Sequence, residues 1–372
     1  MVDLKGQYLK IKEEVDKAII NVLDNTAYVN GPEVHGFQSS LEKYLGAKHV
    51  IPCANGTDAL QVIMMGLGLK PGDEVITSNF TFVATVEVIG LLGLTPVLVD
   101  VDPNTFNISP EAIEKAITPK TKAIVPVHLF GQSAPMKEIM EIAKKHNLFV
   151  IEDTAQATGA EYVCEDGTTK KCGTIGNAGA TSFFPSKNLG AYGDGGAVFT
   201  NDDELAEKLR SIVNHGMTVR YYHDHVGVNS RLDSIQAAVL NVKLAHLDDY
   251  NDARRKAADA YDKAFANEPK ITTPARYEKS NHIFHQYTLV LSEEVDREGL
   301  QNYMQELGVP APIYYPVPLH LQKAYKDSRY TEGDFPVTEQ LCKTVISLPM
   351  HTELDDEQIE FITSNLLKFI NK

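Results

Sequence analysis

The sequence predicts an α/β fold with a mostly parallel sheet, followed by a smaller α+β domain at the C-terminus. Between residues 50 and 152, short apolar runs alternate with helical segments, as in βα units whose parallel strands are covered on both faces. Residues 247–267 form a long helical segment studded with charges, and the composition changes after Pro269. The 372 residues suffice for two domains, which we place at 1–246 and 247–372, with the helix at 247–267 linking them.

The periodicity of the apolar residues predicts the elements in order. Helices are expected at 9–24 and 37–45, before the first repeat. Within the repeats we expect strands at 50–52, 74–77, 96–101, 123–127 and 149–152, and helices at 56–65, 83–92, 110–117 and 136–146. Asp166-Gly167 signals a hairpin turn, and strands at 180–184 and 197–200 and helices at 203–213 and 230–244 follow it. The C-terminal part should contain a strand at 285–291 and helices at 297–307, 338–346 and 356–370.

Composition and charge narrow the class of protein. With 43% hydrophobic and 23% charged residues, the chain is typical of a soluble protein, and no apolar run is long enough for a membrane helix. Its start does not resemble a signal peptide, so we expect a cytoplasmic protein. The net charge of −15 argues against a nucleic-acid partner but leaves room for an anionic small ligand in a cleft. The four cysteines have no zinc-binding spacing, and we expect Cys164 and Cys172 to be free thiols.

Lys187 is the candidate for the central chemical group. It follows an apolar strand, stands between Ser186 and Asn188, and precedes a glycine-rich run at 190–196 that would let a ligand approach the backbone. A desolvated lysine can lose its proton near neutral pH and form a Schiff base. Taken alone, the stretch favours an ordinary surface lysine, because most lysines in loops have no special role.

Residues after the other strands supply a consistent set of partners, since ligands of open α/β sheets bind outside the carboxyl ends of the strands. Gly56 and Thr57 open a helix whose N–H groups suit a phosphate, although Asn55 as a plain helix cap explains them equally well. Phe82 could stack on a flat heterocycle or belong to the core. The carboxylates at 152–153 need a partner, and a protonated pyridine nitrogen would serve Asp153.

Gln156, three residues further on, could donate to a phenolic oxygen of the same ring. A phosphate site, a stacking aromatic, an aspartate for a ring nitrogen and a Schiff-base lysine together predict pyridoxal 5′-phosphate. The sequence has neither a dinucleotide fingerprint nor a P-loop. His282 and His285 are three residues apart in a strand-like run and make a poor metal pair, so no metal site is expected.

These residues resemble the DegT/StrS nucleotide-sugar aminotransferases, which have the aspartate aminotransferase fold (pyridoxal-phosphate fold type I). The resemblance covers nearly the whole chain and includes the runs at 31–34, 54–60, 71–75, 127–132, 152–156, 182–187, 193–196, 229–233 and 315–320. It implies a large domain with a mostly parallel seven-stranded sheet and a smaller α+β domain.

The resemblance also implies roles for individual residues. Lys187 would carry the Schiff base and move the proton between substrate and cofactor, Asp153 would pair with the pyridine nitrogen, and Gln156 would contact the phenolic oxygen. The remaining implied cofactor contacts are Gly56, Thr57 and Ser182 to the phosphate, Phe82 stacked on the ring, and Asn229 reaching the phosphate from the neighbouring subunit of a homodimer.

The implied reaction is a ping-pong transamination in which L-glutamate leaves its amine on the cofactor and a nucleotide-linked keto-sugar collects it. The run at 226–233 resembles members that aminate C3, and the best likeness is to enzymes that act on UDP-2-acetamido-2-deoxy-3-oxo-glucuronate for lipopolysaccharide O-antigen. Arg231 could pair with the uronate carboxylate or form a salt bridge with Asp233.

One departure from the uronate enzymes concerns the sugar site. Tyr314 precedes Tyr315 where those enzymes have a histidine, which keeps a dTDP-3-keto-6-deoxyhexose or a UDP-4-keto-hexose as an alternative substrate. Both tyrosines are candidate substrate contacts. A non-catalytic regulator of the same fold is the alternative of another class.

Overall fold

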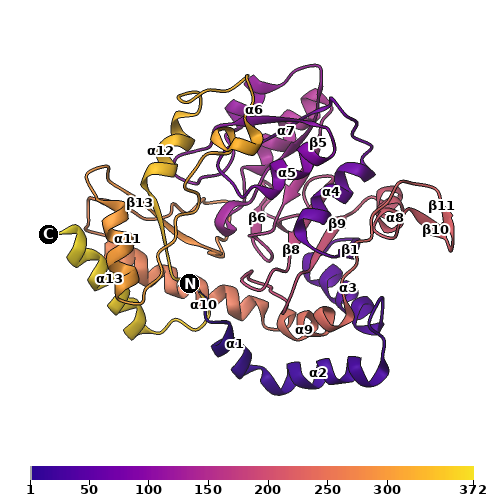
Figure 1. Ribbon diagram of the computed structural model, residues 1–372, viewed down its shortest axis with the longest axis horizontal. Helices are drawn as coiled ribbons and strands as arrows, with labels where there is room; N and C mark the ends of the chain where they lie inside the picture. Colours follow the sequence, from indigo (N-terminus) through magenta and orange to yellow (C-terminus); the bar gives the residue numbers. More distant parts are fainter. Residues whose placement is uncertain (1) are drawn as a thin grey trace.

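The computed structural model describes residues 2–372 and is built around a seven-stranded sheet (Figure 1). The strand order is β1-β9-β8-β5-β4-β2-β3. The bounds are β1 (His49–Cys53), β2 (Glu74–Ser78), β3 (Thr95–Val99), β4 (Thr121–Val125), β5 (Phe149–Asp153), β8 (Ala178–Ser182) and β9 (Gly196–Thr200). β9 runs antiparallel to β1 and β8, and the other neighbouring strands are parallel. This confirms the predicted α/β class.

Successive residues of the strands pack into cores on opposite faces of the sheet, as the pleat requires. Ile51 and Ile151 join the core beneath α4, α5 and α8, whereas Val50 and Val150 pack toward α3, α9, α6 and α7. The helix bounds are α3 (Pro32–Leu45), α4 (Gly56–Gly66), α5 (Ala84–Leu91), α6 (Pro110–Ala116), α7 (Met136–His146), α8 (Asp203–Ile212) and α9 (Ser234–Leu244). Helices on both faces explain why the strands are continuously apolar.

The N-terminal segment contains two helices where one was predicted. α1 (Leu4–Lys10) and α2 (Lys12–Asn25) are separated at Ile11, whose backbone leaves the helical region. Asp3 caps α1 by accepting from the N–H of Gly6 at 2.8 Å. The prediction of a single helix at 9–24 was wrong at this break, because a buried Ile11 continues the apolar pattern across it.

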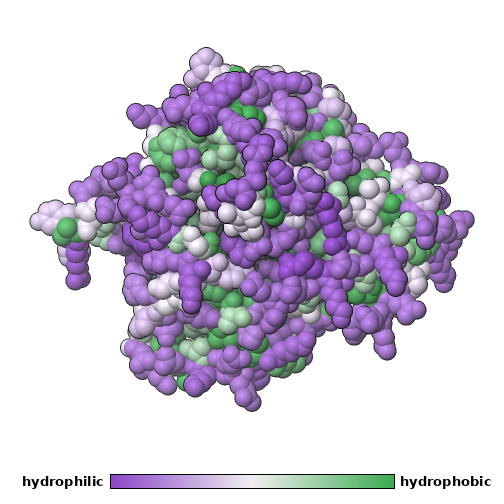
Figure 2. Space-filling view, turned by 180° about the vertical axis from the view of Figure 1, so that it is seen from behind, coloured by the Kyte–Doolittle hydropathy of each residue, from purple (hydrophilic) through white to green (hydrophobic). Residues whose placement is uncertain are grey.

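Two β-hairpins extend from the central layers. β6 (Glu161–Val163) and β7 (Thr169–Lys171) pair around Asp166-Gly167, and Gly167 has the positive φ of 79° that favours glycine. β10 (Met217–Val219) and β11 (Tyr222–His223) form a second hairpin, which projects at the right of Figure 1 and at the left of Figure 2. Tyr221 and Tyr222, at its tip, are 75% and 70% exposed. No strands were predicted for this second hairpin.

The C-terminal part combines a small antiparallel sheet with helices around a core of its own. The sheet order is β12-β13-β14, and the bounds are α10 (Leu247–Phe265), β12 (Ile271–Thr272), β13 (Tyr287–Leu291), α11 (Arg297–Glu306), α12 (Pro336–Thr344), β14 (Val345–Leu348) and α13 (Asp356–Ile370). Three short 3-10 turns complete the elements, η1 (Leu129–Gly131), η2 (Leu319–Leu321) and η3 (Lys323–Tyr325). The predicted helix at 338–346 ends at Thr344, and β14 begins there. A domain boundary at residues 246/247 stays a prediction.

The face of the molecule seen in Figure 2 is mainly hydrophilic, with hydrophobic groups gathered in separate patches. Within residues 2–372, every helix is too short or too polar to cross a lipid bilayer. The four cysteines are free thiols.

Candidate active site

Side chains that follow β1, β2, β5 and β8 meet in one cleft of about 670 Å³ at the carboxyl ends of these strands. The predicted residues that line it are Gly56, Thr57, Phe82, Asp153, Gln156, Ser182, Lys187, Tyr314 and Tyr315. The last two come from the C-terminal part of the chain, so distant segments build the two walls. The parallel arrangement explains the convergence, because parallel strands bring their carboxyl ends to one edge of the sheet.

Lys187 lies in the tight loop that leaves β8. Its backbone N–H donates to the carbonyl of Phe184 at 2.8 Å. The loop then passes so close to itself that a Cβ at Gly190 would lie 2.3 Å from the carbonyl oxygen of Pro185. Burial lowers the pKa of Lys187 to about 8, against the opposing effect of the Asp153 charge. An amine with this pKa is partly neutral near physiological pH, as a nucleophile requires.

Asp153 presents its carboxylate to the same cleft. Its Oδ2 accepts from the hydroxyl of Thr85 at 2.9 Å and its Oδ1 from the N–H of Ala155 at 3.0 Å. Burial raises the pKa of Asp153, while these two donors and the charge of Lys187 lower it. A buried carboxylate with free acceptor capacity suits a cationic ring nitrogen.

Glu152, the preceding residue, does not line the cleft and is hydrogen-bonded inside the protein. Its carboxylate is fully buried and accepts from His128 Nε2 at 2.9 Å and from the N–H groups of Gly173, Ile175 and Gly176 at 2.6–2.8 Å. Burial acts to raise the pKa of Glu152, but the bond to His128 and the backbone donors outweigh it, and the pKa lies below its usual value. Glu152 is therefore a structural anion that ties β5 to the loop before β8.

Gln156 is oriented by two protein groups. Its Oε1 accepts from the N–H of Phe130 at 2.8 Å, and its Nε2 donates to the hydroxyl of Tyr315 at 3.0 Å. The first bond fixes which end of the amide is the donor. One amide hydrogen is left for a ligand beside Tyr315.

The N-terminus of α4 lines one side of the cleft. Asn55 caps the helix by accepting from the N–H of Asp58 at 2.8 Å, so the capping interpretation of this motif is correct. The N–H groups of Gly56 and Thr57 have no partner within residues 2–372. A Cβ at Gly56 would lie 2.7 Å from the Cβ of Ser182, so only glycine allows this approach. The cap therefore leaves these two N–H groups available to an anion.

Phe82 stands at the mouth of the cleft and is 56% exposed, so the alternative that it is a core residue was wrong. Its ring centroid lies 6.4 Å from that of Tyr315 at an interplanar angle of 41°. An exposed aromatic face above the cleft is available for stacking.

Asn229 and Arg231 are the two predicted site residues that do not line this cleft. Asn229 pairs with Asn214 in an isolated bridge near the base of the β10–β11 hairpin. Within residues 2–372, Arg231 has no carboxylate in salt-bridge distance, so the alternative pairing with Asp233 is not formed.

Two functional candidates escaped sequence reasoning. Thr85 holds Asp153 from α5, and nothing in its sequence neighbourhood signals this contact. His285 lines the cleft, and its Nδ1 lies 3.3 Å from Oδ1 of Asn188, next to Lys187. The charges of Lys187 and Arg254 add to burial in holding the pKa of His285 well below its usual value. His285 is therefore a neutral imidazole beside the lysine.

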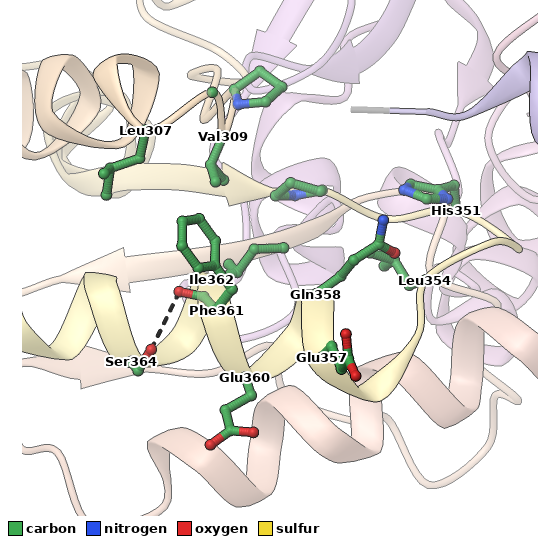
Figure 3. A pocket seen from close by; sticks show the side chains of 13 residues that line it. Leu307, Val309, His351, Leu354, Glu357, Gln358, Glu360, Phe361, Ile362 and Ser364 are labelled. Carbon is green, nitrogen blue, oxygen red and sulfur yellow. Dashed lines mark hydrogen bonds between the residues drawn. The ribbon is translucent and has the colours of Figure 1, made fainter.

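A second hollow of about 760 Å³ lies in the C-terminal part, between α13 and the segment after α11 (Figure 3). Figure 3 shows its apolar wall, with Leu307, Val309 and Phe361, and the carboxylates of Glu357 and Glu360 at α13. Lysine does not occur among its lining residues, and none of the predicted site residues reaches it. Its side chains offer no Schiff-base or phosphate chemistry, so the smaller cleft is the candidate active site.

Comparison with known proteins identifies the family. Residues 9–367 match the model of the DegT/DnrJ/EryC1/StrS aminotransferase family. The chain is 46% identical over 99% of its length to a "Pleiotropic regulatory protein" of Geobacillus stearothermophilus, of which 98% is covered. It is also 46% identical to the UDP-2-acetamido-2-deoxy-3-oxo-D-glucuronate aminotransferase of Pseudomonas aeruginosa, with 98% of each chain covered.

Two further matches are also to aminotransferases. The dTDP-3-amino-3,4,6-trideoxy-alpha-D-glucose transaminase of Streptomyces venezuelae is 40% identical, with 96% of this chain and 92% of that protein covered. The crystal structure of an aminotransferase of the family from Brucella abortus superposes with a TM-score of 0.94 at 43% identity, covering 100% of this chain and 99% of that one. The lysine, the buried aspartate and the anion cradle in the cleft fit pyridoxal phosphate. The chain therefore belongs to the DegT/DnrJ/EryC1/StrS aminotransferase family and is a pyridoxal-phosphate-dependent nucleotide-sugar aminotransferase.

Proposed function

We propose that this enzyme transfers an amino group from L-glutamate to the C3 keto group of UDP-2-acetamido-2-deoxy-3-oxo-glucuronate, for the sugars of a surface polysaccharide such as O-antigen. The observation that carries the proposal is the convergence of Lys187, Asp153 and Gln156 in one cleft, in a chain 46% identical to an enzyme named for this substrate. The cytoplasm is the proposed location, and four free thiols are in keeping with a reducing compartment.

The proposed roles follow from the geometry of the cleft. When bound, pyridoxal phosphate withdraws electrons from the substrate carbon and so makes its proton labile. Lys187, with a pKa lowered to about 8, accepts this proton and returns it. Asp153 keeps the ring nitrogen protonated, Gln156 donates to the phenolic oxygen, and Phe82 covers the ring face.

The phosphate is proposed to rest on the N–H groups of Gly56 and Thr57 and on the hydroxyl of Ser182, where the α4 dipole favours an anion. The cleft of one chain contains a single Lys or Arg among its lining residues, Lys187. The diphosphate and carboxylate of the sugar substrate would add at least three negative charges and need further cations.

We therefore propose a homodimer in which a second copy brings Asn229 and Arg231 to the cleft. Both residues lie outside the cleft of their own chain and follow the exposed β10–β11 hairpin in sequence. Arg231 has no carboxylate partner in its own chain within residues 2–372, which leaves its guanidinium for a uronate. Tyr314 and Tyr315 would contact the sugar from the opposite wall.

A substrate panel tests the proposal. The purified enzyme is given L-glutamate with the UDP-3-oxo-glucuronate sugar, a dTDP-3-keto-6-deoxyhexose or a UDP-4-keto-hexose, and the products are identified by mass. We expect the kcat/KM for the uronate to exceed the others by at least about tenfold, which corresponds to about 1.4 kcal/mol and lies within the range of one charged hydrogen bond.

The dTDP-3-keto-6-deoxyhexose is the second candidate because Tyr314 carries no cation, and the Streptomyces relative is named for a dTDP-sugar. Preference for that sugar would overturn the uronate assignment. Turnover of none of the three would favour a regulatory role, as in the name of the Geobacillus relative.

A further inference from the structure

The run at 315–320 that resembles the family contains a residue to which the proposed reaction gives no role, His320. It lies in η2, five residues after Tyr315, and its side chain is fully buried. Its ring packs against Phe335 at a centroid distance of 4.7 Å. A buried imidazole is normally hydrogen-bonded, and the groups around its nitrogens show what the residue does.

Asn79, which follows β2, supplies the first partner. Its Oδ1 accepts from the backbone N–H of His320 at 2.9 Å, so its Nδ2 is the end that faces the ring, at 2.7 Å from Nδ1. The amide nitrogen can only donate, so Nδ1 accepts and the ring proton is on Nε2. Nε2 lies 3.3 Å from Oε1 of Glu339 but has no hydrogen-bond partner within residues 2–372. The backbone carbonyl of Asn79 also accepts from the N–H of Leu319 at 3.2 Å.

The pair joins the two walls of the cleft. Asn79 begins the loop that carries Phe82, and His320 ends the segment that carries Tyr315. Between them, the ring of Phe80 meets the ring of Tyr315 edge-on at 5.8 Å. Asn79 is fully buried, so water does not compete for these bonds.

We propose that Asn79 and His320 form a positioning pair that sets the distance between the Phe82 wall and the Tyr314–Tyr315 wall. The width of the cleft for the cofactor ring and the sugar then depends on the hydrogen bond between Asn79 Nδ2 and His320 Nδ1. The sugar part of this inference rests on the proposed function, whereas the cofactor part rests on the family alone.

Two substitutions at His320 separate this role from general packing. In His320→Asn the amide reaches the position of Nδ1 and can still accept from Asn79. In His320→Gln the amide reaches the position of Nε2 and keeps only the contact with Glu339. We expect the Kd for pyridoxal phosphate, measured by titrating the apoprotein, and the KM for the sugar to stay within about twofold in H320N. Both should rise about fivefold or more in H320Q, the size of one lost buried hydrogen bond.

Asn79→Ala removes this bond and also the acceptor of the His320 backbone N–H, so its effect should be at least as large as that of H320Q. The double variant should be no worse than N79A, because H320Q loses no bond to Asn79 that N79A keeps. Arg329→Ala is the control: Arg329 lies after η3, binds the carbonyl of Pro96 at 2.8 Å and does not line the cleft, so the cofactor Kd should not change. Melting temperatures identify variants that fail to fold. If H320Q fails to fold, N79A replaces it in the test.

Equal effects of H320N and H320Q, or an effect of R329A on the cofactor Kd, would overturn the proposal. The cofactor titration needs no sugar, so it decides the positioning role even if the substrate panel disproves the uronate. A change in the sugar KM with an unchanged cofactor Kd would contradict the claim for the cofactor ring.

Discussion

Two lysines of this protein share one electrostatic property, but only one of them faces the cleft. Burial lowers the pKa of both Lys187 and Lys243 to about 8. Lys243 donates to the carbonyl of Gly190 at 2.8 Å and packs over the ring of Tyr192. A lowered pKa therefore does not identify a catalytic amine by itself, and its position in the cleft makes Lys187 the candidate.

Replacement of Lys187 by alanine should abolish transamination, by about 10³-fold or more, while the protein stays folded, because the nucleophile is lost and no core contact is. Product formation by mass spectrometry and the melting temperature measure the two effects. Lys243→Met is the matched control: it should lower stability but keep turnover within about tenfold. Full loss of activity in K243M with an intact fold would contradict the distinction between the two lysines.

Thr85 is the residue-scale contact that no sequence pattern indicates. Thr85→Val keeps the shape of the side chain and removes one of two donors to Asp153. The pKa of Asp153, which burial already raises, should rise further, and the carboxylate should hold a protonated ring nitrogen less well.

We expect about fivefold weaker pyridoxal phosphate binding and slower turnover in T85V. The pH at which the absorbance of the bound cofactor changes should also shift. Thr85→Ser restores the hydroxyl and should restore all three. If T85S lost as much cofactor binding and turnover as T85V, the effect would come from packing and not from the hydrogen bond.

At the scale of elements, the site is assembled from strand ends, whereas the β10–β11 hairpin and Asn229 and Arg231 after it do not line the cleft. Asn229 and Arg231 follow this hairpin and miss the cleft of their own chain. In a C2 dimer each such segment would serve the opposite cleft.

A mixture of two inactive variants tests this sharing. Lys187→Ala is unable to react in its own cleft, and a double variant, N229A/R231A, should lack the contacts that it lends to its partner. If clefts are shared, each mixed dimer regains one complete site. Random exchange of subunits should then restore about a quarter of wild-type activity. Recovery should depend on subunit exchange. No recovery after verified exchange would show that Asn229 and Arg231 act within their own chain, and full activity of N229A/R231A by itself would show that they have no role.

At the scale of the whole molecule, buried polar groups join segments that lie far apart in sequence. Glu152 is the strongest example, because four donors surround one carboxylate. Its pKa is lowered below the usual 4.5, so the stability it contributes is complete above that pH. The contribution is lost as the pH falls through the lowered value.

Glu152→Gln would turn an NH₂ group toward these donors and should destabilise the fold by about 1–3 kcal/mol at pH 7. Denaturant unfolding at pH 7 and below pH 4.5 measures the effect, and the difference from wild type should shrink in acid. Glu165→Gln is the control, since Glu165 makes an exposed pair with Lys137 and should change stability by less than about 1 kcal/mol. A constant difference at all pH values would contradict the ionised state of Glu152.

The sequence by itself determined the sheet and most of the cleft. Apolar runs predict the strands because buried strands are apolar on both faces, and the residues just after them predict the site because parallel strands share one carboxyl edge. Gly56, Asp153 and Lys187 could be found in this way, each within a few residues of its strand.

Only the tertiary structure decided the contacts between segments remote in sequence. Thr85 with Asp153 and Asn79 with His320, 68 and 241 residues apart, leave no local pattern. The same is true of His285, which enters the cleft from the C-terminal part. The break at Ile11 and the strand β14 were not predicted for a related reason. An apolar residue fits a helix, a strand or a bend equally well until its packing partners are known.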